Sequence, residues 1–101
     1  MKTAYQMSYG AAAVLLVDGS LPAPVLGDSD LMVKVRYASL NPIDFHMRGG
    51  YGRQIMERKR AAVWPLVLGR DGVGEVIEVG ATVDGFSIGD VIAFALGPED
   101  Q

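Results

Sequence analysis

Residues 68–91 read LGRDGVGEVIEVGATVDGFSIGDV, and this glycine-rich stretch decides the fold. Short runs of β-branched and aliphatic residues, which are typical of strands, alternate here with glycines. Glycine weakens a strand unless the backbone needs a positive φ or another segment passes close by. The pattern therefore predicts a tightly curved part of a small β-barrel, with another group held against its backbone. The glycines are Gly69, Gly72, Gly74, Gly80, Gly85 and Gly89.

Further strands are predicted on both sides of this stretch. The clearest covers residues 31–38, where the odd positions are all apolar and both charged residues, Lys34 and Arg36, fall at even positions, the period of a half-buried strand. A slip by one residue would bury Lys34 and Arg36, so we expect a firm register. The other predicted strands are residues 4–9, 13–17, 66–68, 73–79 and 91–96.

Two short helices are predicted among the strands. Asn41 suits an N-cap and Pro42 the first helical turn, so residues 43–48 should be helical and end at Gly49. Residues 53–60, RQIMERKR, predict a second, exposed helix with a solvated basic face. Many short strands, glycine turns and few helical turns are typical of a small β-barrel.

Composition narrows the functional classes. The 101 residues predict one domain over residues 1–101, and 50% hydrophobic residues with 21% charged ones are typical of a globular protein. A net charge of −3 gives no reason to expect a nucleic-acid partner. The chain has no cysteine, which excludes disulfides and thiolate metal sites and favours a cytoplasmic location. Its apolar run at residues 11–17 is too short to span a membrane, so we expect no membrane association.

Two separated motifs carry a resemblance to a known family. The first is Asn41-Pro42-Ile43-Asp44 followed by Arg48-Gly49-Gly50-Tyr51, and the second is Gly69-Arg70-Asp71 with the glycines that follow it. In this order they resemble the medium-chain dehydrogenases/reductases, whose catalytic half has a GroES-like fold. The resemblance covers about residues 30–96. It implies a mainly β fold, a GroES-like small β-barrel with one or two short helices, which we expect to be incomplete at the C-terminus.

The resemblance also implies that the metal site of the zinc-dependent relatives is missing. Those relatives use a Cys-x-x-Asp pair with a following histidine, and a later Gly-His-Glu. Asn41 stands here at the cysteine position, Asp44 and His46 match the aspartate and histidine, and Arg70 replaces the second histidine. Arginine keeps its proton and cannot bind zinc. The sequence therefore predicts no zinc, and it is similar to the zinc-independent quinone and enone reductases.

That branch implies hydride transfer from NADPH to the conjugated carbonyl of a quinone or enone. Asn41 and Asp44 would then contact the cofactor, and His46, Tyr51 and Arg70 would line the substrate cleft. No side chain is assigned as a catalytic group, because the cofactor carries the chemistry.

Each of these residues also has a plainer interpretation. Asn41 suits a helix cap, and the Asp44 carboxylate suits the positive end of the helix dipole. His46 suits a surface position, and Tyr51 a packed loop aromatic. Arg70 would have a structural role, pairing with Asp44 or with the adjacent Asp71.

The sequence lacks the nucleotide-binding half that the resemblance implies. Gly72-Val73-Gly74 does not begin a dinucleotide-binding motif, because Ile77 occupies the third glycine position and no helix is predicted to follow. We therefore expect a catalytic-domain fragment without turnover of its own, with NADPH bound mainly by an absent Rossmann domain. The unpaired edge of the strand at residues 91–96 should cause self-association or a frayed C-terminus. We expect a homo-oligomer.

Two alternatives involve no reaction. Co-chaperonins share the fold, and residues 74–80 and 88–94 resemble their core hairpin. Against this, a proline-bearing connector at residues 21–30 takes the place of their mobile loop, and the Asn-Pro-Ile-Asp motif would be unexplained. The second alternative is a stand-alone binding module that keeps the cleft and has lost the reaction.

Overall fold

The computed structural model describes residues 2–60 and 62–97. The chain divides into two compact units, each made of discontinuous segments. The first takes in the described parts of residues 1–21, 40–70 and 96–101, and the second takes in residues 22–39 and 71–95. Within the described residues the strands form one two-stranded and one three-stranded sheet, so the predicted mainly β character is confirmed but no closed barrel is present.

The first unit contains an antiparallel pair, β1 (Thr3–Tyr5) and β2 (Leu16–Asp18), separated by a 3₁₀ turn at Ala12–Val14. The strands predicted at residues 4–9 and 13–17 were therefore wrong in their bounds. Gln6 leaves β1 to exchange two backbone hydrogen bonds with Leu66, both of 3.0 Å. The strand predicted at residues 66–68 is reduced to this single bridge.

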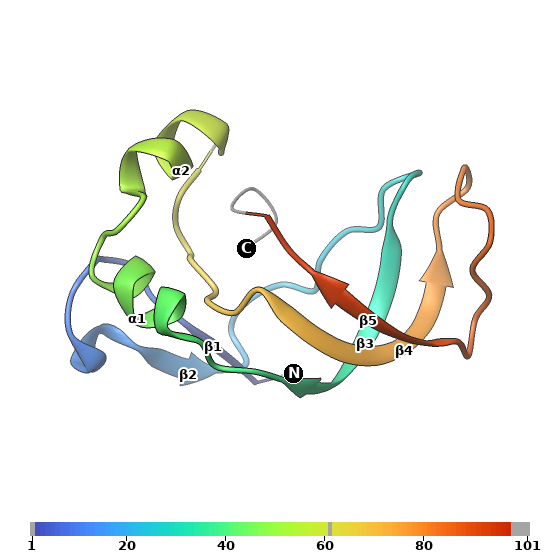
Figure 1. Ribbon diagram of the computed structural model, residues 1–101, viewed down its shortest axis with the longest axis horizontal. Helices are drawn as coiled ribbons and strands as arrows, with labels where there is room; N and C mark the ends of the chain where they lie inside the picture. The colour runs from blue at the N-terminus through green and yellow to red at the C-terminus, as the bar shows by residue number, and fades with distance from the viewer. Residues whose placement is uncertain (1, 61, 98–101) are drawn as a thin grey trace. The chain divides into compact units, whose positions relative to one another are not determined.

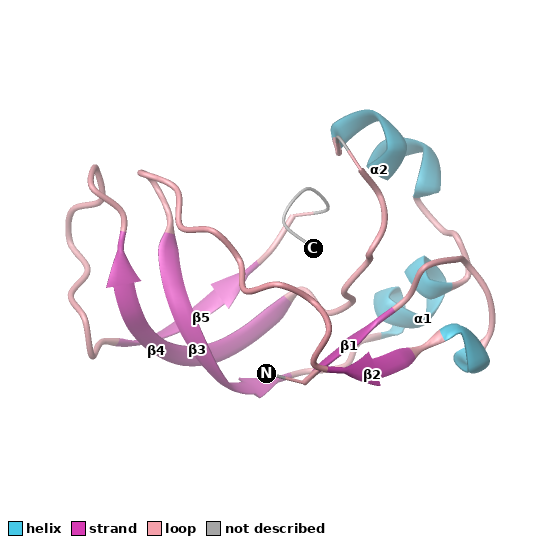
Figure 2. Ribbon diagram, turned by 180° about the vertical axis from the view of Figure 1, so that it is seen from behind, coloured by secondary structure: helices cyan, strands magenta, loops and turns pink. Residues whose placement is uncertain are grey.

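Two helices follow in the same unit, α1 (Pro42–Arg48) and α2 (Arg53–Lys59), shown in Figure 2. Both were predicted. Asn41 is the N-cap of α1 with extended dihedrals, and Gly49 is its C-cap. The prediction of a solvated face on α2 missed that Met56 is buried. Among the described helices, none has the length and apolar character needed to cross a membrane.

The core of the first unit lies between the two helices and the bridge at Leu66. Met47 of α1, Met56 of α2 and Leu66 are almost completely buried. Partly buried apolar residues surround them: Tyr9, Ile43, Val63, Trp64 and Leu68. One fully buried side chain from each of three separate segments therefore holds this unit together.

Tyr9 packs its ring edge-on against Trp64, with ring centroids 4.9 Å apart. Its hydroxyl is buried and has no hydrogen-bond partner among the described residues. Burial raises the pKa of this phenol above its ordinary value of 10.0, and the Glu57 carboxylate acts in the same direction. A folded-state pKa raised in this way means that stability falls as the pH rises above 10.0, because the unfolded chain loses the proton first.

Replacing Tyr9 with phenylalanine should therefore leave the free energy of unfolding unchanged or raise it, by up to about 1 kcal/mol at neutral pH, because an unpaired buried hydroxyl is removed. The gain should grow above pH 10.0, where the wild-type phenol opposes folding. Urea unfolding at both pH values measures the difference, with the exposed Tyr37→Phe as control. A Tyr9→Phe protein less stable than the wild type at both pH values would contradict this account.

The second unit is an antiparallel sheet in the order β3 (Leu31–Ala38), β4 (Asp71–Val79) and β5 (Val91–Ala95). Figure 1 shows the strong curvature of β4. Gly74 in β4 leaves room for the neighbouring strand. A Cβ added to Gly74 would lie 2.5 Å from the Lys34 carbonyl oxygen and 2.5 Å from Val33 Cγ1. The group expected against the glycine backbone is thus β3 itself.

The predicted strand at residues 31–38 is confirmed, but its expected pattern of burial is not. Only the first three residues are partly buried, and Val35 and Tyr37 are 47% and 74% exposed. The pairing with β4 is irregular between Met32 and Val33 and again between Val35 and Tyr37. Each irregularity interrupts the two-residue period on which the expected register depended.

Gly74→Ala should lower the free energy of unfolding by roughly 1–3 kcal/mol, because the new methyl group meets backbone that cannot move without disturbing the sheet. Chemical denaturation monitored by circular dichroism measures this loss. Gly49→Ala is the matched control, since its added Cβ would lie 3.6 Å from the nearest atom, an ordinary contact. Equal stability of the two variants would show that the close approach of β3 is unimportant.

β3 and β5 are the outer strands of this sheet, so each pairs on one side only within the described residues. Self-association through such an edge stays a prediction.

Candidate functional site

The Asp44 carboxylate joins the two sequence motifs. Asp44 is only 3% exposed, and its two oxygens accept different backbone N–H groups. Oδ2 accepts from Asn41 at 2.9 Å, and Oδ1 accepts from Gly69 at 3.1 Å. Gly69 has a φ of 102°, in the region that favours glycine. The start of α1 and the Gly69-Arg70 segment therefore meet at one buried charge.

This arrangement favours the plainer interpretations of Asn41 and Asp44. Asn41 occupies the N-cap of α1, as expected for a helix cap. Asp44 lies in the first turn of that helix, where a carboxylate is favoured, and hydrogen bonds to backbone N–H groups occupy both of its oxygens. The predicted contact of both residues with a nicotinamide stays a prediction.

A hollow of about 230 Å³ lies beside these motifs in the same unit. Helices α1 and α2, the turn between them and Arg70 provide its walls, and most of the lining is apolar. The lining residues are Ile43, Met47, Tyr51, Gly52, Ile55, Met56 and Arg70. Two of the predicted cleft residues, Tyr51 and Arg70, are thus brought together.

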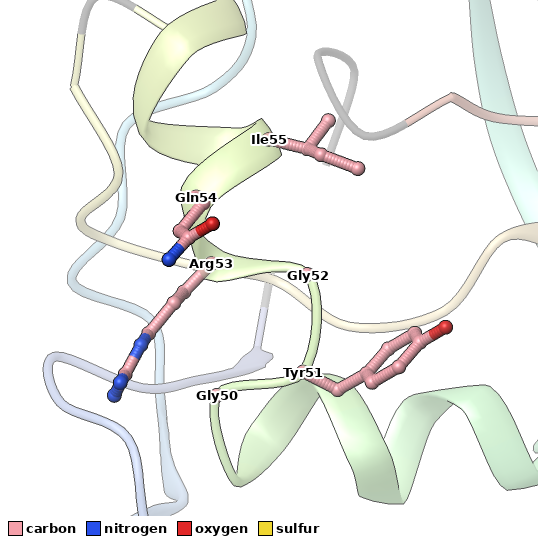
Figure 3. Close-up of a pocket in the computed structure, with 6 residues that line it drawn as sticks. All are labelled: Gly50, Tyr51, Gly52, Arg53, Gln54 and Ile55. Carbon is pink, nitrogen blue, oxygen red and sulfur yellow. The ribbon is translucent and has the colours of Figure 1, made fainter.

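A second hollow of about 380 Å³ follows the backbone of residues 50–55. Figure 3 shows that the Tyr51 and Ile55 side chains extend on one side of this segment, and Arg53 and Gln54 on the other. Tyr51 and Ile55 line both hollows. Tyr51 is 67% exposed, so it is a residue of the rim and not the packed loop aromatic of its plainer interpretation.

The guanidinium of Arg70 is poorly satisfied. Its Nη2 donates to the Met47 sulfur at 3.1 Å, and its buried Nε has no hydrogen-bond partner among the described residues. Within the described residues no ion pair joins Arg70 to Asp44 or to Asp71, so that prediction was wrong. Backbone N–H groups already occupy Asp44, and Asp71 accepts a hydrogen bond from the Ser39 hydroxyl.

His46 lies on α1 with an exposed side chain and lines neither hollow. Its ring centroid is 6.1 Å from that of Tyr51, with the rings tilted by 58°. His46 therefore lies beside the rim, and its contact with a substrate stays a prediction. Within the described part of the chain, no three residues of the metal-binding types form a cluster that could hold a metal ion.

Sequence reasoning missed four apolar residues of the lining: Ile43, Met47, Ile55 and Met56. A signal for the first pair was present, because residues four apart lie on one face of a helix. For the second pair, two adjacent apolar residues inside a basic run were the signal. The basic charges suggested an exposed helix with a solvated face, and the buried side of α2 at Met56 was not predicted.

Comparisons with known proteins agree on one relationship. Residues 27–99 match the family of alcohol dehydrogenase GroES-like domains. The NAD(P)H oxidoreductase RTN4IP1, mitochondrial, of Danio rerio is 39% identical in an alignment of 102 positions that covers 92% of this chain and 26% of that protein. The chain thus spans about a quarter of the length of this curated relative.

Solved structures give a similar result. The quinone oxidoreductase from Coxiella burnetii superposes with a TM-score of 0.82 at 35% identity, covering 96% of this chain and 30% of that one. The quinone oxidoreductase of Pseudomonas syringae pv. Tomato DC3000 gives 0.80 at 30% identity, covering 97% and 28%.

Proposed function

Because this chain belongs to the family of alcohol dehydrogenase GroES-like domains, we propose that it contributes the catalytic domain of an NADPH-dependent quinone or enone oxidoreductase that works without zinc. The GroES-like fold and the kinship with quinone oxidoreductases, both expected from the sequence, are confirmed. The related proteins are oxidoreductases of the medium-chain family. NADPH, the conjugated carbonyl and the absence of zinc are the proposed part.

One observation supports this function most strongly. The hollow at α1 and α2 is mainly apolar, carries a single charged side chain, and adjoins the two motifs that Asp44 joins. Flat conjugated rings bind well in a site of this kind, where apolar side chains cover the ring and a few polar groups fix its orientation.

The described residues fit a flat conjugated substrate ring placed beside the reactive end of a nicotinamide dinucleotide. Ile43, Met47 and Ile55 can cover the substrate ring, and the guanidinium of Arg70, which lines the same hollow, can donate to an oxygen of that ring. No described helix follows the Gly72-Val73-Gly74 segment, which continues as strand β4, so this segment offers no helix N-terminus to a pyrophosphate.

When bound, the nicotinamide would supply the hydride, and the side chains of this chain would supply position. The apolar residues of α1 and α2 would exclude water from the reacting carbon of the substrate and hold the substrate ring in place. Tyr51, on the rim, would cover the open side of the bound ring. No residue has to act as a nucleophile, because the hydride goes directly to the conjugated system.

Steady-state oxidation of NADPH by the complete gene product, with 1,4-benzoquinone as acceptor, tests the proposal. We expect quinone-dependent oxidation whose rate is unchanged after dialysis against EDTA. Tyr51→Ala should lower kcat/KM about tenfold, equivalent to roughly 1.4 kcal/mol of lost stabilisation of the transition state.

Tyr37→Ala is the matched control, because Tyr37 is similarly exposed but lies on β3 in the second unit. Loss of activity on removal of metal would contradict the zinc-free reaction. An equal effect of the two tyrosine substitutions would contradict the assignment of Tyr51 to the cleft.

A further inference from the structure

Arg70 carries a charge that the described residues leave without a counter-charge. A guanidinium has five N–H donors and no acceptor, so several donors need partners. Nη2 contacts the Met47 thioether, which is a weak acceptor, and the buried Nε has no hydrogen-bond partner among the described residues. The ion pair found among the described residues joins Arg36 to Glu75 in the other unit and does not involve Arg70.

The apolar surroundings of Arg70 strengthen the attraction between its charge and an anion. Ile43, Met47, Ile55 and Met56 line the same hollow and bring no carboxylate or amide side chain to it. In such apolar surroundings an electrostatic interaction is stronger than in water, and an unpaired donor is more costly. A purely hydrocarbon group should therefore bind weakly beside Arg70, and a group with a negatively charged oxygen should bind there more tightly.

We propose that Arg70 determines specificity by binding a carboxylate on the substrate ring, so that the enzyme prefers acidic quinones or enones to neutral ones. The planar guanidinium matches a carboxylate with two parallel hydrogen bonds, which a lone ketone oxygen cannot reproduce. This inference rests on the proposed function for the reacting carbonyl, because both use the same hollow.

The volume of the hollow limits the substrate further. About 230 Å³ is less than the roughly 300–1,000 Å³ of sites that enclose drug-sized ligands. The part of the substrate that enters should therefore be a single ring with its acidic group, and any longer substituent should remain outside, beyond Tyr51.

Benzoate and benzamide, which have the same ring and differ in charge, are suitable probes for the 101-residue chain. Titration followed by ¹H–¹⁵N NMR should show benzoate binding at least about tenfold more tightly than benzamide, with a shift of the Arg70 Nε–H signal. Arg70→Met should abolish this preference, and Arg70→Lys should retain a reduced one, because the charge remains but the fork is lost. Arg58→Met, at an exposed position on α2, is the control and should retain it fully.

The amide spectrum of each variant shows whether the fold is preserved. If Arg70→Met does not fold, the benzoate preference of Arg70→Lys tests the inference instead. Equal affinity for the two probes in the wild type, or an unchanged preference in the folded Arg70 variants, would overturn the inference. The complete gene product could reduce 1,4-benzoquinone and yet bind benzoate no more tightly than benzamide. That result would overturn the inference about Arg70 and leave the proposed function intact. A benzoate preference in a gene product that oxidises no NADPH would support the anion site and remove the proposed reaction.

Discussion

Replacing Asp44 with alanine is expected to lower the free energy of unfolding by about 3–5 kcal/mol. The carboxylate makes two hydrogen bonds to backbone N–H groups, and bonds to a charged group contribute roughly 1.5–3 kcal/mol each. The substitution also leaves the Asn41 N–H without the carboxylate that accepts it at the start of α1, and leaves a void where a buried side chain stood. Urea unfolding of the chain, followed by circular dichroism, measures the loss.

Two further variants separate the causes. Asp44→Asn keeps the shape of the side chain but presents an N–H₂ group to one of the two backbone donors. It should therefore lower the free energy of unfolding by about half as much as Asp44→Ala. Asp84→Ala, at an exposed position, is the control and should stay within about 0.5 kcal/mol of the wild type. A loss from Asp44→Ala no larger than that from Asp84→Ala would show that the carboxylate does not join the two motifs in solution.

Replacing Leu66 with alanine is expected to cost about 2–5 kcal/mol, the range observed when a fully buried leucine is truncated in a core that cannot collapse. Leu66 has no exposed surface and contacts Met47 and Met56 in the core cluster. Its backbone is fixed by the two hydrogen bonds to Gln6, so the remaining side chains can fill the cavity only in part. Thermal or chemical unfolding measures the change.

Leu40→Ala is the matched control, because Leu40 is 74% exposed and its truncation should cost little. A drop in stability at Leu66 as small as that at Leu40 would mean that the core cluster is not formed in solution. A cavity that stays open can also be detected directly, since a small apolar ligand should bind to the Leu66→Ala protein and raise its stability.

Local signals predicted much of the fold. The N-cap at Asn41, the proline after it and Gly49 gave the bounds of α1 closely, because helix capping depends on neighbouring residues. The glycine-rich stretch predicted strand β4, and the alternation at residues 31–38 predicted β3 with its bounds.

Non-local pairing could not be predicted in this way. Nothing near Gln6 in the sequence indicates that its backbone will pair with Leu66 and end β1 early. The irregularities within the β3–β4 pairing likewise depend on both strands at once, so the exposure of Val35 and Tyr37 was missed.

The sequence predicted several residues of the candidate site correctly, but it predicted their interactions less well. Tyr51 and Arg70 do line one hollow, and Asn41 and Asp44 are joined by a hydrogen bond. The partner of Arg70 was predicted wrongly, because Arg70 and Asp44 occupy positions that hold the metal site in zinc-dependent relatives, and opposite charges there suggested an ion pair. The backbone N–H groups of Asn41 and Gly69 compete for the same carboxylate, and their directions follow from the fold alone.

The bridge between Gln6 and Leu66 has a consequence for the synthesis of the protein. A nascent chain must extend to Arg48 before the side-chain amide of Gln6 can donate to the Arg48 carbonyl, and to Leu66 before the Gln6 backbone finds its partner. Because the entropy of closing so long a loop is lost before these bonds form, the N-terminal segment should be one of the last parts of its unit to become ordered during translation.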